Sequence, residues 1–159
     1  MNFLLKSTLG AGVAAAVIAT ATIAGSHSGK DMDPAVAARH AQMQMIGYSI
    51  GILGAVAKGE MEFDAAMVNS AAANINSLAM LDRTTLWIEG TEQGAAHGSR
   101  AKAEIWSDPD GFAKEFDALA AAAEPLMTAA DVDAVRANMQ ALGGSCSACH
   151  KKYRGPKNE

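Results

Sequence analysis

Apolar residues recur at spacings of three and four in four separate segments of this chain. Such spacing gathers apolar side chains on one face of an α-helix, and no segment shows the strict alternation that is typical of a β-strand. The segments are residues 33–58, residues 64 to the region of 78–86, residues 108–125 and residues 131–153. The chain is also rich in Ala, Leu and Met, which favour helices, and only 5% of its residues are aromatic. The pattern therefore predicts an all-α fold of four helices.

Residues that start and stop helices mark the ends of these segments. In the first segment, Asp33 can cap the helix, Pro34 suits the first helical position, and Gly59 follows Lys58 as a terminator. Pro125 should kink the third helix or end it nearby, because proline has no backbone N–H to donate. The other three helices begin at aspartates that can act as N-caps, at Asp64, Asp108 and Asp131.

The same spacing identifies the side chains expected to face the core. In the first helix they are Val36, Met43, Ile46, Ile50, Leu53 and Ala57. In the second they are Met67, Ala71, Asn74, Leu78 and Leu81, with Ile75 beside them. In the third they are Phe112, Phe116, Leu119 and Ala123, and in the fourth Val132, Val135, Met139, Leu142, Cys146, Cys149 and Tyr153. Met45 lies about 200° from Met43 around the helix, so Met43 is the inward methionine.

Between the second and third helices, Trp87 leads into a glycine-rich polar stretch over residues 89–99. This stretch is long enough to be a crossover, or a flap over part of a cofactor. A phosphate-binding role is a weaker alternative, because its glycines match no nucleotide-binding motif.

The chemistry is concentrated near the C-terminus, in the run Cys146-Ser147-Ala148-Cys149-His150. A C-x-x-C-H run is typical of covalent c-type haem attachment, in which two thiols bond to the porphyrin vinyl groups and the imidazole ligates the iron. On a helix, residues three and four apart share a face, so both cysteines and the histidine project together. Because the run continues the apolar stripe of the fourth helix, we expect one haem c inside the bundle.

Three other uses of these cysteines are less favoured. A thioredoxin-like redox pair would need neighbouring strands, which the pattern does not predict. A zinc site would need a fourth ligand, but His27, His40 and His97 are distant in sequence and there is no third cysteine. A disulfide between cysteines three apart on one helix would constrain little. The three histidines are instead expected at the surface.

The N-terminus has the features of a targeting signal. Residues 1–24 combine a basic start, an apolar stretch and small residues, as in a cleaved secretory signal peptide. A membrane anchor is less favoured, because a spanning helix needs about 20 apolar residues. Residues 25–32 would form a short lead, 33–155 the domain and 156–159 a tail. The net charge of −4 argues against a nucleic-acid partner. Because of the signal-like N-terminus, we expect an exported, periplasmic protein without stable membrane insertion.

With the haem motif on the last of four helices, the chain resembles the class II c-type cytochromes, the group that contains cytochrome c′. Residues 52–60 and 105–108 resemble the family's end of helix one and its entry to helix three. Residues 86–91 lack the Phe-Pro that many members carry, which leaves the loop conformation open. The resemblance implies an antiparallel up-down-up-down four-helix bundle with the haem bound inside, near the C-terminal helix.

The resemblance also implies roles for individual residues. Cys146 and Cys149 would form the thioethers, and His150 would be the proximal iron ligand. Arg154 would lie near the proximal haem face, and Arg39 would pair with a haem propionate. A solvated helix face is the alternative for both arginines.

Met43 falls where the family places the residue on the distal side of the iron. As the sixth ligand, its soft thioether would favour reduced iron and suit a one-electron carrier that serves redox partner proteins. As a space-filling residue, it would leave the iron five-coordinate and high-spin, able to bind nitric oxide or carbon monoxide. We favour methionine ligation, with the gas-binding protein as the alternative.

The remaining expectations concern catalysis, packing and assembly. We expect no enzyme activity, because no distal histidine and arginine form a tight motif of the kind a peroxidase needs. Trp87 is expected to pack and, since it closes the second helix, to touch the porphyrin. Met45 and Tyr48 are candidates for the outward patch through which family members often form homodimers.

Overall fold

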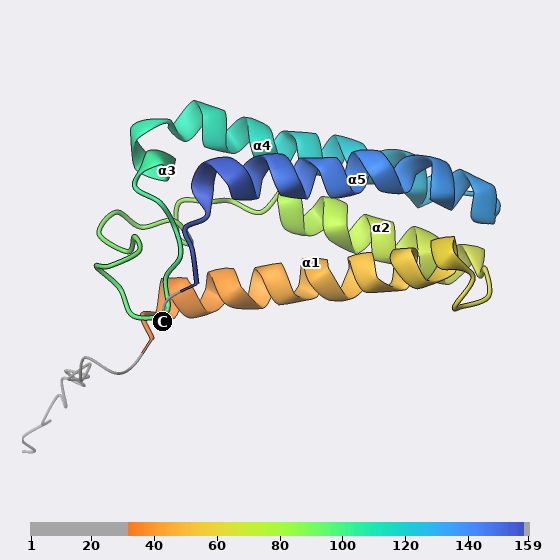
Figure 1. Ribbon diagram of the computed structural model, residues 1–159, viewed down its shortest axis with the longest axis horizontal. Coiled ribbons are helices and arrows are strands. Elements are labelled where there is room, and N and C mark those ends of the chain that lie inside the picture. Colours follow the sequence, from red (N-terminus) through yellow and green to blue (C-terminus); the bar gives the residue numbers. More distant parts are fainter. Residues whose placement is uncertain (1–31, 158–159) are drawn as a thin grey trace, which may run out of the picture.

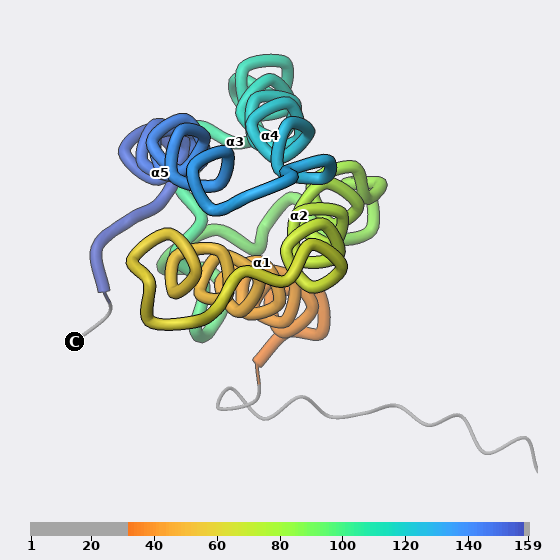
Figure 2. The backbone as a smooth tube through the Cα atoms, turned by 90° about the vertical axis from the view of Figure 1, so that its right-hand side faces the viewer, coloured from red at the N-terminus to blue at the C-terminus, as the bar shows by residue number. Residues whose placement is uncertain are grey.

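The structure, a computed structural model, describes residues 32–157. Within them four long helices, α1 (Pro34–Lys58), α2 (Ala65–Ala79), α4 (Pro109–Ala123) and α5 (Val132–Tyr153), lie side by side. Each runs opposite to the one before it in the chain, so the order is up-down-up-down (Figure 1). Viewed along the bundle, the helices occupy its four corners (Figure 2). The predicted all-α four-helix bundle is therefore confirmed.

The predicted signal peptide over residues 1–24 lies outside the described residues, as does the predicted lead except for Met32. The same holds for the last two residues of the tail. In the described part of the chain, no helix combines the length and the apolar character that crossing a bilayer requires.

Each long helix begins at the aspartate predicted as its N-cap. At α1, Asp33 Oδ1 accepts a hydrogen bond from the backbone N–H of Ala35 at 2.8 Å. That helix ends where Gly59 adopts a left-handed φ of 76°. At α5, Asp131 Oδ1 accepts from the backbone N–H of Ala134, also at 2.8 Å. These bonds satisfy donors that the first turn of a helix leaves free, which is why aspartate marks the starts.

The second helix is shorter than predicted. It ends at Ala79, whereas the prediction carried it into residues 78–86. Beyond its end, the Asp82 carboxylate accepts from the backbone N–H of Thr84 at 2.8 Å. A short polar side chain that bonds to the backbone two residues ahead stabilises a turn in place of a helix.

The predicted inner stripe of α2 was wrong in part. Asn74 is exposed, and Leu81, which is 43% exposed, lies beyond the end of the helix. The residues that α2 buries are Val68, Ala71, Ala72, Ile75 and Ala79. Three of these five are alanines, which let α2 lie close to α1 and α4. The prediction for α2 relied on the spacing of large apolar side chains, so it missed a buried face that consists mainly of alanines.

Two short helices flank α4. The lead-in before it forms α3 (Glu104–Ser107), and the 3₁₀ helix η1 (Glu124–Thr128) follows it. Pro125 lies in η1, so α4 ends at Ala123, near the proline as predicted.

An aromatic cluster joins α4 and α5 to the chain that follows α2. The ring of Phe112 lies edge-on to those of Trp87, Phe116 and Tyr153, with centroid distances of 4.7, 5.3 and 5.1 Å. Phe112, Phe116 and Tyr153 are all buried. Edge-to-face packing of this kind fixes each ring relative to its neighbours.

Residues 88–101, here called loop 88–101, are bonded to the chain that follows α5. Arg100 donates from Nη2 and Nε to the carbonyl oxygen of Gly155, at 2.7 and 3.0 Å. The N–H of Gly155 donates back to the carbonyl oxygen of Arg100 at 2.7 Å. The N–H of Lys102 donates to the carbonyl oxygen of Tyr153 at 3.0 Å. The loop is thereby fixed beside the end of α5.

Candidate functional site

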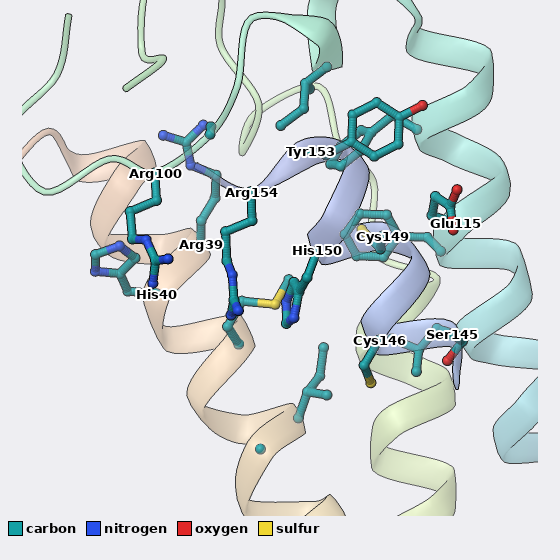
Figure 3. Close-up of a pocket in the computed structure, with 18 of the residues that line it drawn as sticks. Arg39, His40, Arg100, Glu115, Ser145, Cys146, Cys149, His150, Tyr153 and Arg154 are labelled. Carbon is teal, nitrogen blue, oxygen red and sulfur yellow. The ribbon is translucent and has the colours of Figure 1, made fainter. Parts of the chain in front are cut away.

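A cavity of about 550 Å³ lies between α1, α4, α5 and loop 88–101. This volume is within the range of about 300 to 1,000 Å³ that is typical of cofactor sites. Its apolar lining includes Val36, Ile46, Ile50, Phe112, Phe116 and Leu119. Figure 3 shows four basic residues on one side of the cavity, namely Arg39, His40, Arg100 and Arg154.

Both cysteines of the predicted haem motif line this cavity from α5. They are free thiols, not joined to each other. Burial raises the pKa of Cys146. Burial, and after it the negative charge of Glu115, raises the pKa of Cys149 to about 11. Both thiols are therefore protonated at neutral pH, and a protonated thiol is a weak nucleophile.

His150 lines the cavity beside the cysteines, as the motif predicts. Burial lowers the pKa of its imidazole, and the positive charges of Arg154 and Arg100 lower it further. The imidazole is therefore neutral at pH 7, which is the form that can ligate a metal. Arg154 is exposed overall, yet it lines the cavity and acts on the imidazole through its charge.

Met43 lines the cavity from α1, a helix that packs against α5. The side chain is 36% exposed, whereas that of Met45 is 52% exposed and takes no part in the lining. The prediction that Met43 is the inward methionine of the pair is confirmed. Its thioether is thus available at the cavity wall, on a different helix from the cysteines and His150.

Arg39 is buried, with only 4% of its surface exposed, so the solvated helix face considered for it is excluded. Its Nη2 donates to the carbonyl oxygen of Thr91 at 3.0 Å. Its guanidinium carbon lies 4.8 Å from the centre of the Trp87 ring. Burial lowers the pKa of the guanidinium and nearby Asp33 raises it. An arginine remains charged in such a setting, so the cavity wall carries a buried positive charge.

Two side chains that line the cavity, Arg39 and Trp87, each have a buried nitrogen, Nη1 and Nε1, without a hydrogen-bond partner among residues 32–157. A buried donor without a partner costs about 1 to 3 kcal/mol, and native proteins leave few of them. In the described part of the chain, two more buried side-chain atoms lack a partner, Gln42 Oε1 and Asn69 Oδ1, and both are acceptors of residues outside the cavity lining. An acceptor that reached either nitrogen would remove this cost.

Three ionisable residues of the lining were missed by the sequence analysis. His40 was expected at the surface but is half-buried and lines the cavity. His40 lies three residues before Met43 and therefore on the same helical face, so the sequence could have predicted that it lines the cavity. Glu115, three residues after Phe112 on α4, carried the same signal. Arg100 lies in a loop whose conformation no spacing rule predicts.

The donor set of the cavity fits a haem better than a bare metal ion. Within residues 32–157, no three His, Cys, Asp or Glu side chains are grouped so as to hold a metal ion. His97 is exposed, as predicted, and His27 lies outside the described residues. An ion bound near His150 would therefore depend on ligands from another molecule, as the iron of a porphyrin does.

Comparison with known proteins gives consistent matches. The family described as Cytochrome C′ matches residues 34–154, which include all four long helices and the C-x-x-C-H run. The chain is similar to a cytochrome c′ of Cereibacter sphaeroides, at 34% identity over 158 residues, which cover 97% of this chain and 98% of that protein.

Solved structures of other proteins are similar to this fold, and two of them illustrate the match. One is cytochrome c′ from Rhodobacter Spheriodes, with a TM-score of 0.72, 33% identity, and coverage of 77% of this chain and 96% of that chain. The other is a nitric oxide complex of a mutant cytochrome c prime from Alcaligenes xylosoxidans, with a TM-score of 0.65 and 31% identity. It covers 77% of this chain and 94% of that chain.

Proposed function

Because this chain belongs to the cytochrome c′ family, whose members bind a covalently attached haem c, we propose that Cys146 and Cys149 carry the haem and that His150 is its axial iron ligand. The observation that supports these roles is the convergence of two thiols and a neutral imidazole, from one face of α5, on a single apolar cavity. When bound, the haem supplies an iron centre that can exchange one electron or take up a small ligand.

For the opposite side of the iron, the first candidate is the binding of a small neutral gas, nitric oxide or carbon monoxide. The lining that α1 contributes from Met43 to Ile50 is entirely apolar, which suits a neutral diatomic ligand. The relatives named cytochrome c′, one of them solved as a nitric oxide complex, support this choice over the electron carrier that the sequence analysis favoured. In this role, Met43 shapes the cavity without bonding to the iron.

The second candidate is a one-electron carrier with Met43 as the sixth ligand. It is favoured by one observation, the presence of a thioether in the cavity wall on the helix that faces α5. A thioether is a soft ligand that stabilises reduced iron and so raises the reduction potential. In this role, the distal position would be closed to gases.

Absorption spectra of the purified holoprotein decide between these candidates. They would be recorded oxidised, reduced and with carbon monoxide, for the natural chain, Met43→Ala and the control Met45→Ala. A gas-binding protein gives high-spin bands that Met43→Ala leaves unchanged, together with ready carbon monoxide binding. Low-spin bands that Met43→Ala converts to high-spin, with gas binding appearing only in that variant, would instead establish the electron carrier. Met45→Ala should match the natural chain in either case.

Covalent attachment is tested separately by intact mass and by haem staining after denaturation. The natural chain should retain one haem, and the double change Cys146→Ser and Cys149→Ser should retain none. A natural chain that loses its haem on denaturation would contradict the proposed roles of these cysteines.

We also propose that the protein works in the periplasm after removal of residues 1–24, that it exchanges electrons with protein partners when it acts as a carrier, and that it catalyses no reaction itself. N-terminal sequencing of exported protein tests the cleavage.

We further propose that the chain forms a homodimer through α1. The proposed contact contains Met45 and Tyr48, whose side chains are 52% and 71% exposed. Sedimentation equilibrium should then show a dimer that Tyr48→Lys dissociates, and a monomeric natural chain would contradict this contact.

A further inference from the structure

We propose that Glu115 sets the reduction potential of the haem iron: its carboxylate, which α4 brings to the cavity wall, lowers the midpoint potential. The inference rests on the proposed haem binding and deepens it. Among the described residues that line the cavity, Glu115 is the only acidic one, and nothing in the proposed haem attachment uses it.

The first support is the position of Glu115 in the fold. It lies on α4 three residues after Phe112 and directly before Phe116, and all three residues line the cavity. The two phenylalanine rings are buried and pack edge-on at 5.3 Å, which holds this part of α4 against the cavity. The side chain of Glu115 is itself half-buried, so water surrounds its charge only in part.

The second support is that no ion pair among the described residues neutralises this carboxylate. The ion pairs within 4.0 Å in residues 32–157 join other residues, namely Lys58 with Glu60, Arg136 with Asp133 and Lys152 with Asp108. Figure 3 shows three basic residues of the lining, Arg39, His40 and Arg100, on the other side of the cavity from Glu115. The negative charge of Glu115 therefore faces the cavity without a paired positive charge.

The third support is that this charge acts on an atom proposed to hold the haem. Among the charges that shift the pKa of Cys149, that of Glu115 has the largest effect, and it raises this pKa. Arg154 and Lys152 act on the same thiol in the opposite direction and more weakly. The sulfur of Cys149 would be bonded to the porphyrin, so a charge that acts on this sulfur also acts on the ring and its iron.

The direction of the effect follows from the charges involved. Reduction adds one electron to the iron, so the haem becomes more negative by one elementary charge. A nearby carboxylate makes this step less favourable, and it does so more strongly in a largely apolar cavity than in water, because the dielectric constant is lower. Glu115 therefore stabilises Fe(III) relative to Fe(II), which lowers the reduction potential.

The test compares Glu115→Gln, which keeps the size of the side chain but removes its charge, with the control Asp117→Asn. Asp117 is on the same helix, but it is exposed and does not line the cavity. Both variants are prepared as holoprotein, covalent haem is verified first, and midpoint potentials are measured by redox titration. Glu115→Gln should raise the potential, so that the ratio of Fe(II) to Fe(III) at a fixed electrode potential increases several-fold. Asp117→Asn should stay close to the natural chain, because solvent and salt screen an exposed charge.

Equal potentials in Glu115→Gln and the natural chain would overturn the proposal. Glu115→Asp separates the charge from packing, because it shortens the side chain and keeps the carboxylate. Its potential should lie nearer to that of the natural chain than to that of Glu115→Gln. If both variants raise the potential equally, the side chain acts through packing and the proposal is wrong. Glu115→Ser, which also removes the charge, gives the same comparison if the glutamine variant does not fold.

Salt provides a further readout that a purely structural role would not produce. The difference in potential between Glu115→Gln and the natural chain should persist at high ionic strength, because a half-buried charge is screened less than an exposed one. A difference that disappears in high salt would mean that the charge acts through solvent, which contradicts the proposal. Absence of covalent haem would contradict the proposed function, whereas attached haem whose potential does not respond to Glu115→Gln would contradict this inference alone.

Discussion

Phe112 links three aromatic rings around the cavity, and replacing it tests how much of the bundle's stability depends on that cluster. Its ring is 5% exposed and meets Trp87, Phe116 and Tyr153 edge-on at 4.7, 5.3 and 5.1 Å. Such pairs contribute about 0.5 to 1.5 kcal/mol each beyond the burial of their surface. Phe112→Leu keeps most of the buried volume but removes all three pairs. We therefore expect the free energy of unfolding to fall by about 2 to 4 kcal/mol.

Urea unfolding of the holoprotein, followed by circular dichroism, measures this loss. The matched control is Phe63→Leu, since Phe63 is half-buried and makes no ring contact with the described aromatic residues. The slope of the unfolding free energy against urea should stay the same in both variants, because neither change alters the surface exposed on unfolding. If Phe112→Leu and Phe63→Leu cost the same, the aromatic contacts contribute nothing special and the reasoning is wrong.

Three further predictions concern helix ends and acid stability. Gly59→Ala should lower the unfolding free energy by about 1 kcal/mol in urea titration, because φ is 76° there and alanine disfavours left-handed backbone. Asp64→Ala should lower the unfolding free energy by about 1 kcal/mol in the same titration. The change removes the N-cap of α2, where Asp64 Oδ1 accepts a hydrogen bond from the backbone nitrogen of Met67 at 2.7 Å. The hydroxyl of Tyr153 donates to Asp108 and is the main cause of the lowered pKa of that carboxyl. The resulting stabilisation is full above the ordinary pKa of 3.8 and is lost as pH falls through the lower folded value, so Tyr153→Phe should weaken the pH dependence of stability in acid titrations.

Local chemistry made several features predictable from the amino-acid sequence. The N-caps at Asp33 and Asp131 depend on bonds to residues two or three positions ahead, so short-range pattern suffices. The same holds for Cys146, Cys149 and His150, whose spacing alone places them on one face of α5, and the structure puts all three at one cavity. Met43 was predicted inward by spacing relative to the rest of α1.

Features that depend on tertiary packing were not predictable in this way. The inner face of α2 was misplaced because Ala72 and Ala79 are buried by the close approach of α1 and α4, which their own hydrophobicity does not reveal. The burial of Arg39 depends on Thr91, 52 residues away, and on Trp87. Arg100 lines the cavity and bonds to Gly155, 55 residues away. None of these partners is visible in the local pattern.

The position of the C-x-x-C-H run on the final helix also constrains the order of biogenesis. A ribosome synthesises α1, α2 and α4 before the cysteines and His150 exist, and α5 contacts both α1 and α4. The bundle can therefore close only after nearly the whole chain has been made. When the proposed haem-attaching residues are made, the sequences of the other three long helices are already complete. A product that ends before Cys146 would lack both cysteines and His150, the residues that we propose hold the haem.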